Sequence, residues 1–423
     1  MGERFFALGV SFAVTVVVAR YLGPADYGLL AYALSLTSLF AAAGHMGLSG
    51  LVVREIIKKP EQHAETLGTT LALKFLGMLI GYAGLVIYAA VYEGVNTTAY
   101  YLVLISGAAL LIKPSEVISF WFEAFIKARY ITLARISALT SASVLQFAFV
   151  VAGSSVTFFA TASLLQAVIA AAILVILFNA TSTIRLSDWR FSRERAKELL
   201  GQGWIIYLGS IFAVIYLKID QVMLRWYAGA EEVGIYSIAA QLSEAWYFVP
   251  AAIVASFFPK LISLREENEK LFYKRLQQLF DALFIIALVV AVLMTVSAEW
   301  IIALFFGAHY SESAPILVIH IWAALFIFMR AAFSKWILIE NALIFSLLTQ
   351  GLGAVVNIVL NYFLIPEFGG QGAAYATLLS YAVASYFALL CYGKTRKVFW
   401  LMSRAFLSPV RYGYHFAKGD QFR

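Results

Sequence analysis

Residues 156–179 read VTFFATASLLQAVIAAAILVILFN, a stretch of 24 residues without a single charged side chain. A helix needs about 20 predominantly apolar residues to cross the hydrocarbon core of a bilayer. Similar stretches recur along the whole chain, and they lack the period of two that a membrane β-barrel requires. Because only helices and closed barrels satisfy their backbone hydrogen bonds in lipid, the sequence predicts an all-α integral membrane protein.

The composition of the 423-residue chain supports this class. Hydrophobic residues make up 62% of it and charged residues 13%, whereas a soluble domain is about half apolar and about a quarter charged. About 12 transmembrane helices are predicted, at residues 5–21, 29–52, 67–92, 99–126, 130–152, 156–179, 203–227, 233–259, 277–305, 314–337, 342–365 and 371–392. The single cysteine, Cys391, excludes an intrachain disulfide and a cysteine-cluster metal site.

Lys and Arg side chains are distributed unevenly between the two ends of the predicted spans. With the N-terminus in the cytoplasm, 25 of the 31 Lys and Arg residues fall on the cytoplasmic side and only Arg20 and Arg225 on the outer side. The positive-inside rule then favours a multi-pass protein of the cytoplasmic (inner or plasma) membrane with both termini in the cytoplasm. This distribution explains the net charge of +7 without a nucleic-acid partner.

A short motif occurs twice. Residues 20–29 read RYLGPADYGL and residues 225–235 read RWYAGAEEVGI, and one insertion aligns arginine, acid and glycine at offsets of 205 and 206. The predicted organisation is an N-terminal six-helix bundle at 1–180, a cytoplasmic linker at 181–202, a C-terminal six-helix bundle at 203–392 and a basic cytoplasmic tail at 393–423. Because six spans is an even number, a pseudo-two-fold axis along the membrane normal would relate the bundles. Alternatively, short turns between helices simply share Gly and acidic residues.

Charged side chains inside spans are costly and usually face a cavity or a partner. Four cations lie within predicted spans: Lys74, Lys113, Lys218 and Arg330. The candidate carboxylates within spans are three, Glu116, Asp220 and Glu244. The net positive interior suits an anionic group such as a lipid pyrophosphate. The alternative is that these charges pair and hold the helices together. Lys113 and Glu116, three residues apart on one helix face, could neutralise each other. Lys74 could instead extend to the inner interface.

Other polar and helix-breaking residues inside spans are candidates for ion coupling or bending. Lys218 and Asp220 are two residues apart, so they point to opposite sides of a helix and at least one needs another partner. Pro114 and Pro250 each free a backbone carbonyl and are candidate hinges, although a tolerated kink is the alternative. His320 is a candidate proton relay, or simply forms a hydrogen bond between helices.

No catalytic constellation is present in the sequence. It contains no GxxxxGK[ST] phosphate loop, no HExxH and no CxxC. The predicted outer loops, such as 153–155 and 366–370, are too short to carry the acidic residues of a membrane glycosyltransferase. The sequence therefore predicts a transporter and not an enzyme, without a cofactor or a metal.

Five segments occur in order along nearly the whole chain: ARYLGPADYG at 19–28, GLSGLVVRE at 47–55, KIDQVML at 218–224, VGIYSIAAQLSE at 233–244 and IPEFGGQGAA at 365–374. Together they resemble the oligosaccharide flippase, or polysaccharide biosynthesis protein, family of the MATE-like exporter superfamily.

This resemblance implies two six-helix bundles arranged as a V around a central cavity that opens alternately to each side. It implies a polyprenyl-pyrophosphate-linked oligosaccharide as cargo, moved to the outer leaflet for surface polysaccharide assembly, with a polymerase and assembly proteins as further partners. Cationic cavity residues would bind the pyrophosphate. Lys218 and Asp220 lie in a matched motif, whereas Lys74, Lys113 and Arg330 rest on the charge argument alone.

Other functions stay open from the sequence. A cation-coupled exporter of small drugs or metabolites has the same fold, but its cavity would be expected to be acidic. A membrane glycosyltransferase or polymerase would need a longer outer loop, and a peptidoglycan-precursor flippase often has more than twelve spans.

Overall fold

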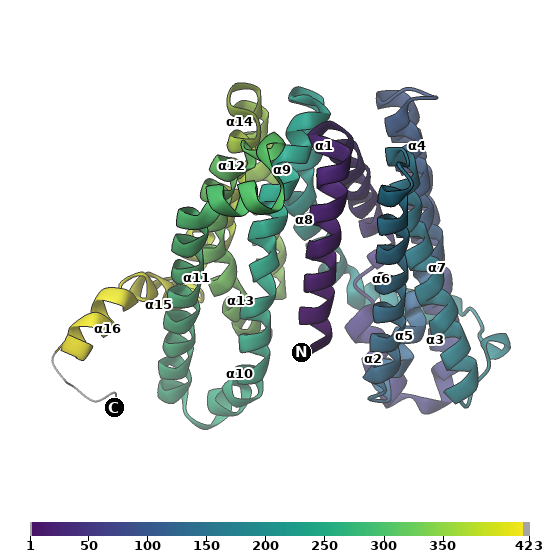
Figure 1. The fold of residues 1–423 in the computed structure, drawn as a ribbon. Helices are drawn as coiled ribbons and strands as arrows, with labels where there is room; N and C mark the ends of the chain where they lie inside the picture. Colours follow the sequence, from purple (N-terminus) through teal and green to yellow (C-terminus); the bar gives the residue numbers. More distant parts are fainter. Residues whose placement is uncertain (1, 418–423) are drawn as a thin grey trace. The chain divides into compact units, whose positions relative to one another are not determined.

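The computed structural model describes residues 2–417, which form helices joined by short turns (Figure 1). No β-strand occurs in this range. The helices are α1 (Gly2–His45), α2 (Ser49–Lys58), α3 (His63–Tyr92), α4 (Thr98–Ile112), α5 (Val117–Ala124), α6 (Ala128–Val151), α7 (Val156–Thr181), α8 (Arg193–Tyr227), α9 (Gly229–Glu244), α10 (Phe248–Glu267), α11 (Glu269–Phe305), α12 (Ser313–His320), α13 (Ala324–Ile339), α14 (Leu343–Ser385), α15 (Arg396–Phe406) and α16 (Ser408–Ala417).

Ten helical stretches among the described residues are long and apolar enough to cross a membrane. Two of them contain a break, at Gly23 in α1 (φ 72°) and at Gly369 in α14 (φ 54°). Glycine adopts this left-handed region without the steric cost that a Cβ brings. Each break separates two helices, and this accounts for the total of about 12 transmembrane helices that the sequence predicts.

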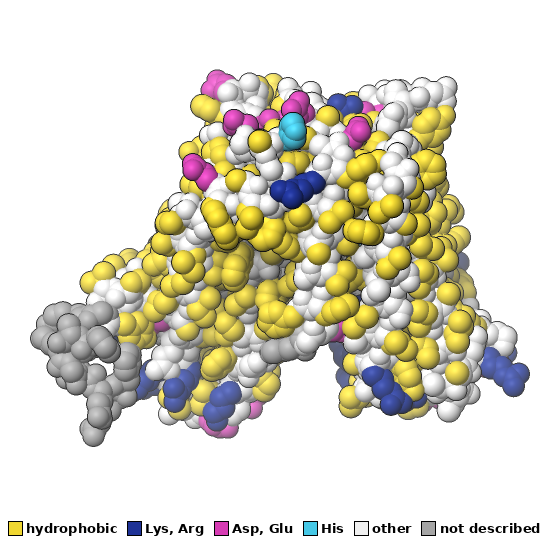
Figure 2. All heavy atoms as spheres, in the orientation of Figure 1, with side chains coloured by type: hydrophobic (Ala, Val, Ile, Leu, Met, Phe, Trp, Pro, Cys, Tyr) yellow, Lys and Arg dark blue, Asp and Glu magenta, His cyan; other side chains and the backbone are white. Residues whose placement is uncertain are grey.

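The chain forms two compact units, Met1–Gly234 and Ile235–Arg423. The first contains α1 to α8 and the beginning of α9, and the second contains the remaining helices. On the face shown in Figure 2, most Lys and Arg side chains of each unit lie at one end, and a few lie near the other end.

The second predicted span, 29–52, is wrong at its inner end. Helix α1 ends at His45 and α2 begins at Ser49, so a turn interrupts the expected helix. At Gly47 a Cβ atom would lie 2.7 Å from the backbone nitrogen of Tyr207 and 2.9 Å from the carbonyl oxygen of Gly203. The chain turns here because its backbone packs directly against the backbone of α8.

The repeated motif forms a reciprocal contact inside the first unit. A Cβ atom on Gly28 would collide with the carbonyl oxygen of Ala230, and one on Gly234 would collide with the carbonyl oxygen of Pro24. The offset of 206 relates Gly28 to Gly234 and Pro24 to Ala230, so each copy of the motif makes the same contact with the other. Such reciprocity is the signature of a two-fold relation.

A buried ion pair attaches the beginning of α8 to the first unit. Arg195 is 3% exposed, and its Nη2 donates to Oε2 of Glu55 in α2 at 3.0 Å. Its Nε also donates to Oγ1 of Thr66 in α3 at 3.2 Å. A buried guanidinium needs such partners because its desolvation is otherwise uncompensated. The polar segment before α8 is therefore held against α2 and α3.

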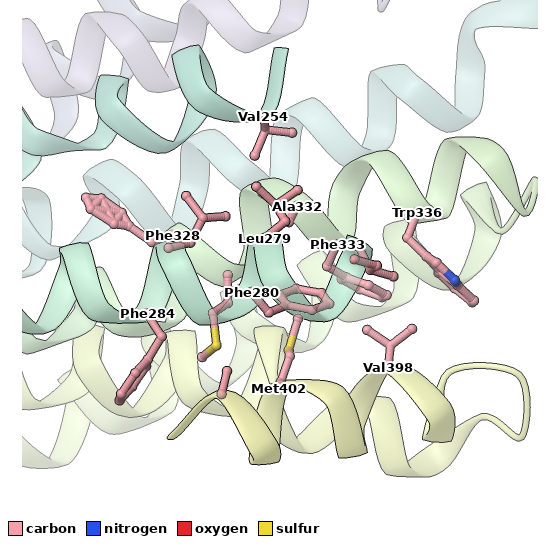
Figure 3. Packing of buried hydrophobic residues seen from close by; sticks show 14 of the residues in the cluster. Val254, Leu279, Phe280, Phe284, Phe328, Ala332, Phe333, Trp336, Val398 and Met402 are labelled. Carbon is pink, nitrogen blue, oxygen red and sulfur yellow. The ribbon is translucent and has the colours of Figure 1, made fainter. Parts of the chain in front are cut away.

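An apolar cluster of the second unit lies between α10, α11, α13 and α15 (Figure 3). Phe280 of α11 and Phe328 and Phe333 of α13 are completely buried in it. Val398 and Met402 of α15 point into the same cluster, so the chain after the last span belongs to the core of this unit.

Substitution of Gly28 by Ala should lower the thermal stability of the purified protein. The added methyl group has no space against the carbonyl of Ala230, and overpacking of this kind costs about 1–3 kcal/mol. The control is Gly9→Ala, in the same helix with no atom within 4 Å of its Cβ, which should cost nothing. The midpoint of thermal denaturation in detergent measures both, and equal midpoints would contradict the reciprocal contact.

Substitution of Glu55 by Gln should also be strongly destabilising. It leaves the buried Arg195 without its buried counter-charge, and breaking such a pair costs roughly 3–5 kcal/mol. Glu198 also pairs with Arg195, but its side chain is 38% exposed. The matched variant Glu198→Gln should therefore lower the unfolding midpoint far less. If the two variants unfold at the same temperature, the burial of the carboxylate does not determine how much its ion pair stabilises the protein.

Candidate functional site

The first unit contains a polar cavity of about 370 Å³. This volume is within the range of small-ligand pockets. Side chains from the second half of α1, from α4, α6 and α7, and from the turn after α4 line it. The polar ones are Thr37, Ser38, Ser106, Lys113, Ser115, Glu116, Arg135, Ser163 and Gln166.

A break in the fourth span brings two predicted site residues to this cavity. Helix α4 ends at Ile112, a 3₁₀ turn, η2, covers Lys113–Glu116, and α5 continues from Val117. Pro114 lies at the start of the turn, where its missing N–H removes an α-helical hydrogen bond. The tighter turn places Lys113 and Glu116 together on the cavity wall, in the middle of the span.

Lys74 is held by an ion pair at the edge of this turn. Its side chain is 2% exposed, and its Nζ lies 3.4 Å from Oε2 of Glu116. The ring of Phe120 lies 5.2 Å from the same Nζ and adds a cation–π contact. The side chain is therefore enclosed by protein, and Glu116 pairs with Lys74 of α3.

Two other cations line the cavity without a counter-charge. Among the described residues, no carboxylate lies within ion-pair distance of Lys113 or Arg135. Oγ1 of Thr37 and Oγ of Ser106 are buried in the same wall and have no hydrogen-bond partner in the described part of the chain. Unsatisfied buried donors of this kind require an explanation, and a bound water or ligand provides one. The cavity therefore offers two positive charges that no carboxylate of the described residues neutralises.

The other predicted residues of the first unit lie on α8. Asp220 is 3% exposed and Lys218 is half-buried. Both have interactions with other groups, so neither is free. They do not belong to the lining of the polar cavity.

The remaining predicted residues belong to the second unit. Glu244 ends α9, a 3₁₀ turn η4 (Ala245–Tyr247) follows, and Pro250 lies in the first turn of α10. His320 ends α12 just before the 3₁₀ turn η6 (Ile321–Ala323), is 2% exposed, and has its ring 5.9 Å from that of Tyr236. Glu244 and His320 thus both lie where a span is interrupted.

Arg330 of α13 donates hydrogen bonds to acceptors on α14. Its Nη1 donates to Oγ1 of Thr349 at 3.1 Å and to the carbonyl oxygen of Ala384 at 3.2 Å. Its guanidinium also lies 5.5 Å from the ring of Phe333. These contacts orient the guanidinium, which also has interactions with other groups.

The sequence alone does not identify Arg135, Gln166 or the buried hydroxyl groups as site residues. The charge distribution groups Arg135 with the basic residues of the cytoplasmic side, because it lies close to the start of its span. The structure places it two turns into α6, on the cavity wall. A charged residue that far inside a span is the signal that could have identified it. Within residues 2–417, no three His, Cys, Asp or Glu side chains come together as a metal site.

The Lys74–Glu116 pair should show strong thermodynamic coupling. Glu116→Gln leaves a buried ammonium without its counter-charge and should cost about 1–3 kcal/mol, since Glu116 is half-exposed. Lys74→Met keeps the apolar stem and removes the charge, so Glu116→Gln should add little in that background. Unfolding midpoints of the two single variants and the double variant measure this coupling. Strictly additive effects would show that the pair does not stabilise the fold.

Comparison with known proteins identifies relatives along most of the chain. The polysaccharide biosynthesis protein family matches residues 4–265. The chain is 24% identical over 378 residues to a putative O-antigen transporter of Shigella flexneri, and the match covers 84% of this chain and 87% of that protein. This similarity extends through both units.

Two archaeal relatives match a shorter part. An uncharacterized membrane protein of Methanocaldococcus jannaschii is 27% identical over 199 residues, and a probable flippase of Haloferax volcanii is 27% identical over 195 residues. These matches cover 46% and 44% of this chain, and 38% and 39% of the length of those relatives. The relatives with named activities are flippases and transporters, not enzymes.

Solved structures have the same fold. An inward-facing multidrug resistance MATE family transporter has a TM-score of 0.72 at 17% identity, covering 93% of this chain and 95% of that one. The lipid II flippase MurJ has a TM-score of 0.70 at 14% identity, covering 100% of this chain and 92% of that one. At such identities the likeness shows the fold alone. Since the family matches more than half of the chain, this protein belongs to the polysaccharide biosynthesis protein family.

Proposed function

We propose that this protein is a flippase that moves a polyprenyl-pyrophosphate-linked oligosaccharide from the inner to the outer leaflet. The names of two relatives, an O-antigen transporter and a probable flippase, support this class of cargo. A third relative, also from Haloferax volcanii, is a probable flippase of low-salt glycan biosynthesis that is 21% identical over 390 residues. Surface polysaccharide assembly would then follow, with a polymerase and assembly proteins as later partners.

The observation that carries the proposal is the pair of free cations, Lys113 and Arg135, in one polar cavity. A diphosphate bears adjacent negative charges and many acceptor oxygens. Lysine binds such a group as a point charge, and arginine binds it through two parallel N–H donors.

The same observation argues against a cationic cargo. A cavity for cationic drugs needs carboxylates that are not neutralised, whereas Glu116 is already paired with Lys74. We therefore place the drug-exporter alternative second. Lys218, Arg330 and Lys74 are further candidates for the cationic surface that the cargo meets.

Alternating access accounts best for transport through such a cavity. The 3₁₀ interruptions at η2, η4 and η6 support this mechanism, because bending is easiest where the α-helical hydrogen bonds are broken. Pro114 and Pro250 lie beside two of them and are the proposed hinges. The titratable groups Glu116, Asp220, Glu244 and His320 are candidates for coupling to an ion gradient.

The location of the basic residues supports an orientation with both termini in the cytoplasm and a cytoplasmic membrane location. The headgroup would then enter the cavity from the cytoplasmic leaflet. The polyprenyl tail would stay in the bilayer during transport. The sequence has no nucleotide-binding loop, so an ion gradient or the downstream use of the glycan would drive the cycle.

Flipping of a fluorescent polyprenyl-pyrophosphate oligosaccharide in proteoliposomes tests this function. Lys113→Gln and Arg135→Gln should each slow flipping roughly ten- to a hundredfold, because a charge-assisted hydrogen bond contributes about 1.5–3 kcal/mol. The matched control is Arg129→Gln, on the same helix as Arg135, whose exposed guanidinium lies over the ring of Tyr130. It should flip at the wild-type rate.

Two results would contradict the proposal. One is a wild-type protein that ignores the lipid but moves a soluble cation, which would favour the drug exporter. The other is a wild-type flipping rate in the Lys113 and Arg135 variants, which would show that flipping does not depend on the cations of this cavity.

A further inference from the structure

The chain after the last span is basic and helical. Residues 394–417 contain five Lys or Arg residues and no Asp or Glu. Within them lie α15, with 11 residues, and α16, with 10. Both helices are far too short to cross a bilayer, which needs about 20 residues. Their role therefore differs from that of the helices before them.

One face of this helix pair is fixed to α11. Val398, Met402 and Ala405 are completely buried against the apolar cluster of the second unit (Figure 3). Polar contacts add to this packing. Nε2 of Gln277 donates to the carbonyl oxygen of Leu401 at 3.0 Å. The carboxylate of Asp281 accepts from Arg411 at 2.6 Å and from the hydroxyl of Tyr412 at 3.0 Å.

The attachment points define the level of the helix pair along α11. Residues 269–281 of α11 contain five charged residues, ending with Asp281, whereas residues 282–298 contain none. Gln277 and Asp281 thus lie where α11 changes from a polar to an apolar surface. This change marks the boundary between water and hydrocarbon. In Figure 1, α15 and α16 extend sideways from α11, as expected for helices at that boundary.

The opposite face of the pair mixes basic and apolar side chains. Arg396, Trp400 and Arg404 follow one another at intervals of four residues along α15, and all three are exposed. Trp400 is 67% exposed, and Leu407 and Val410 after it are 64% and 75% exposed. Large apolar side chains on this face are poorly suited to water, and cations among them are poorly suited to a protein core. Tryptophan, leucine and extended arginine side chains together are typical of a helix in the bilayer interface.

We propose that α15 and α16 form an interfacial anchor that binds anionic phospholipids of the leaflet at this end of the protein. The apolar side chains Trp400, Leu407 and Val410 would enter the level of the upper acyl chains. Arg396 and Arg404 would reach the phosphate groups beside them. Arg411 and Lys397 are paired with Asp281 and Glu269 of α11, so Arg396 and Arg404 are the cations that would complement a negatively charged leaflet.

The anchor is tested in the full-length protein with a spin label at Leu407→Cys, in a Cys391→Ser background that removes the single native cysteine. Collisions of the label with oxygen report lipid, and collisions with a water-soluble nickel complex report solvent. In nanodiscs the label should gain oxygen collisions and lose nickel collisions relative to detergent. The change should be larger when the nanodisc contains phosphatidylglycerol than when it contains phosphatidylcholine alone.

The charge requirement is tested by adding Arg396→Gln and Arg404→Gln together. Each cation near an anionic surface changes the affinity roughly fivefold, so the half-saturating concentration of short-chain phosphatidylglycerol in detergent should rise roughly twenty-fivefold. The control replaces Lys270 and Lys274, two exposed cations at the beginning of α11, by Gln. It removes the same charge outside the anchor and should leave the titration unchanged.

Two outcomes would overturn the proposal. A label that stays accessible to the nickel complex in nanodiscs would show a water-exposed face, as expected for a protein-docking site. A titration that is the same for the two double variants would show that the cations of the anchor do not select anionic lipid. Neither outcome depends on whether the protein flips a glycan.

Discussion

A charged side chain inside a hydrocarbon layer must find a counter-charge or a polar cavity, and this requirement organises the charges of the protein. Where the structural role dominates, the charge is paired, as Lys74 is with Glu116. Lys113 and Arg135 depart from this pattern in the described part of the chain, and both line the same cavity. In the proposed function the unpaired charges are the ones that meet the cargo, whereas the paired ones hold the surrounding helices together.

The fold can be predicted from the sequence because membrane spans are defined by local composition. Long apolar runs, glycines at the breaks of α1 and α14, and a motif that occurs twice are all visible in the order of residues alone. The contacts of the cavity are not, because they depend on the rotation of each helix about its axis. The spacing along the chain suggests Lys113 as the partner of Glu116, whereas the ion pair forms with Lys74 on another helix. Helix α15 escapes prediction for another reason: its 11 residues cannot span a bilayer and therefore look like part of a tail.

The position of α8 shows how a few polar contacts determine the grouping of helices. By sequence, α8 begins the second set of six spans. In the structure its contacts group it with the first unit, which continues to Gly234. The Arg195 cluster holds its beginning, and the backbone of Gly203 approaches Gly47. Near its end, Nη2 of Arg225 pairs with Glu93 at 2.9 Å. Contacts at both ends thus hold α8 in the first unit.

The internal repeat extends beyond the short motif, because spans of the two units are interrupted at corresponding positions. Shifting Lys113–Glu116 by the repeat offset of 206 gives residues 319–322, which overlap the 3₁₀ turn Ile321–Ala323. Only the first of these turns contains a proline, so proline cannot be the common cause of the break. What the two turns share is a titratable side chain at or beside the break: Lys113 and Glu116 in one unit and His320 in the other. A helix that is broken in the middle of a span exposes backbone N–H and C=O groups that need hydrogen-bond partners. A charged side chain at the break can contact these groups, which a regular helix would not offer. The interruption that would permit bending thus also explains why Lys113, Glu116 and His320 lie at these turns.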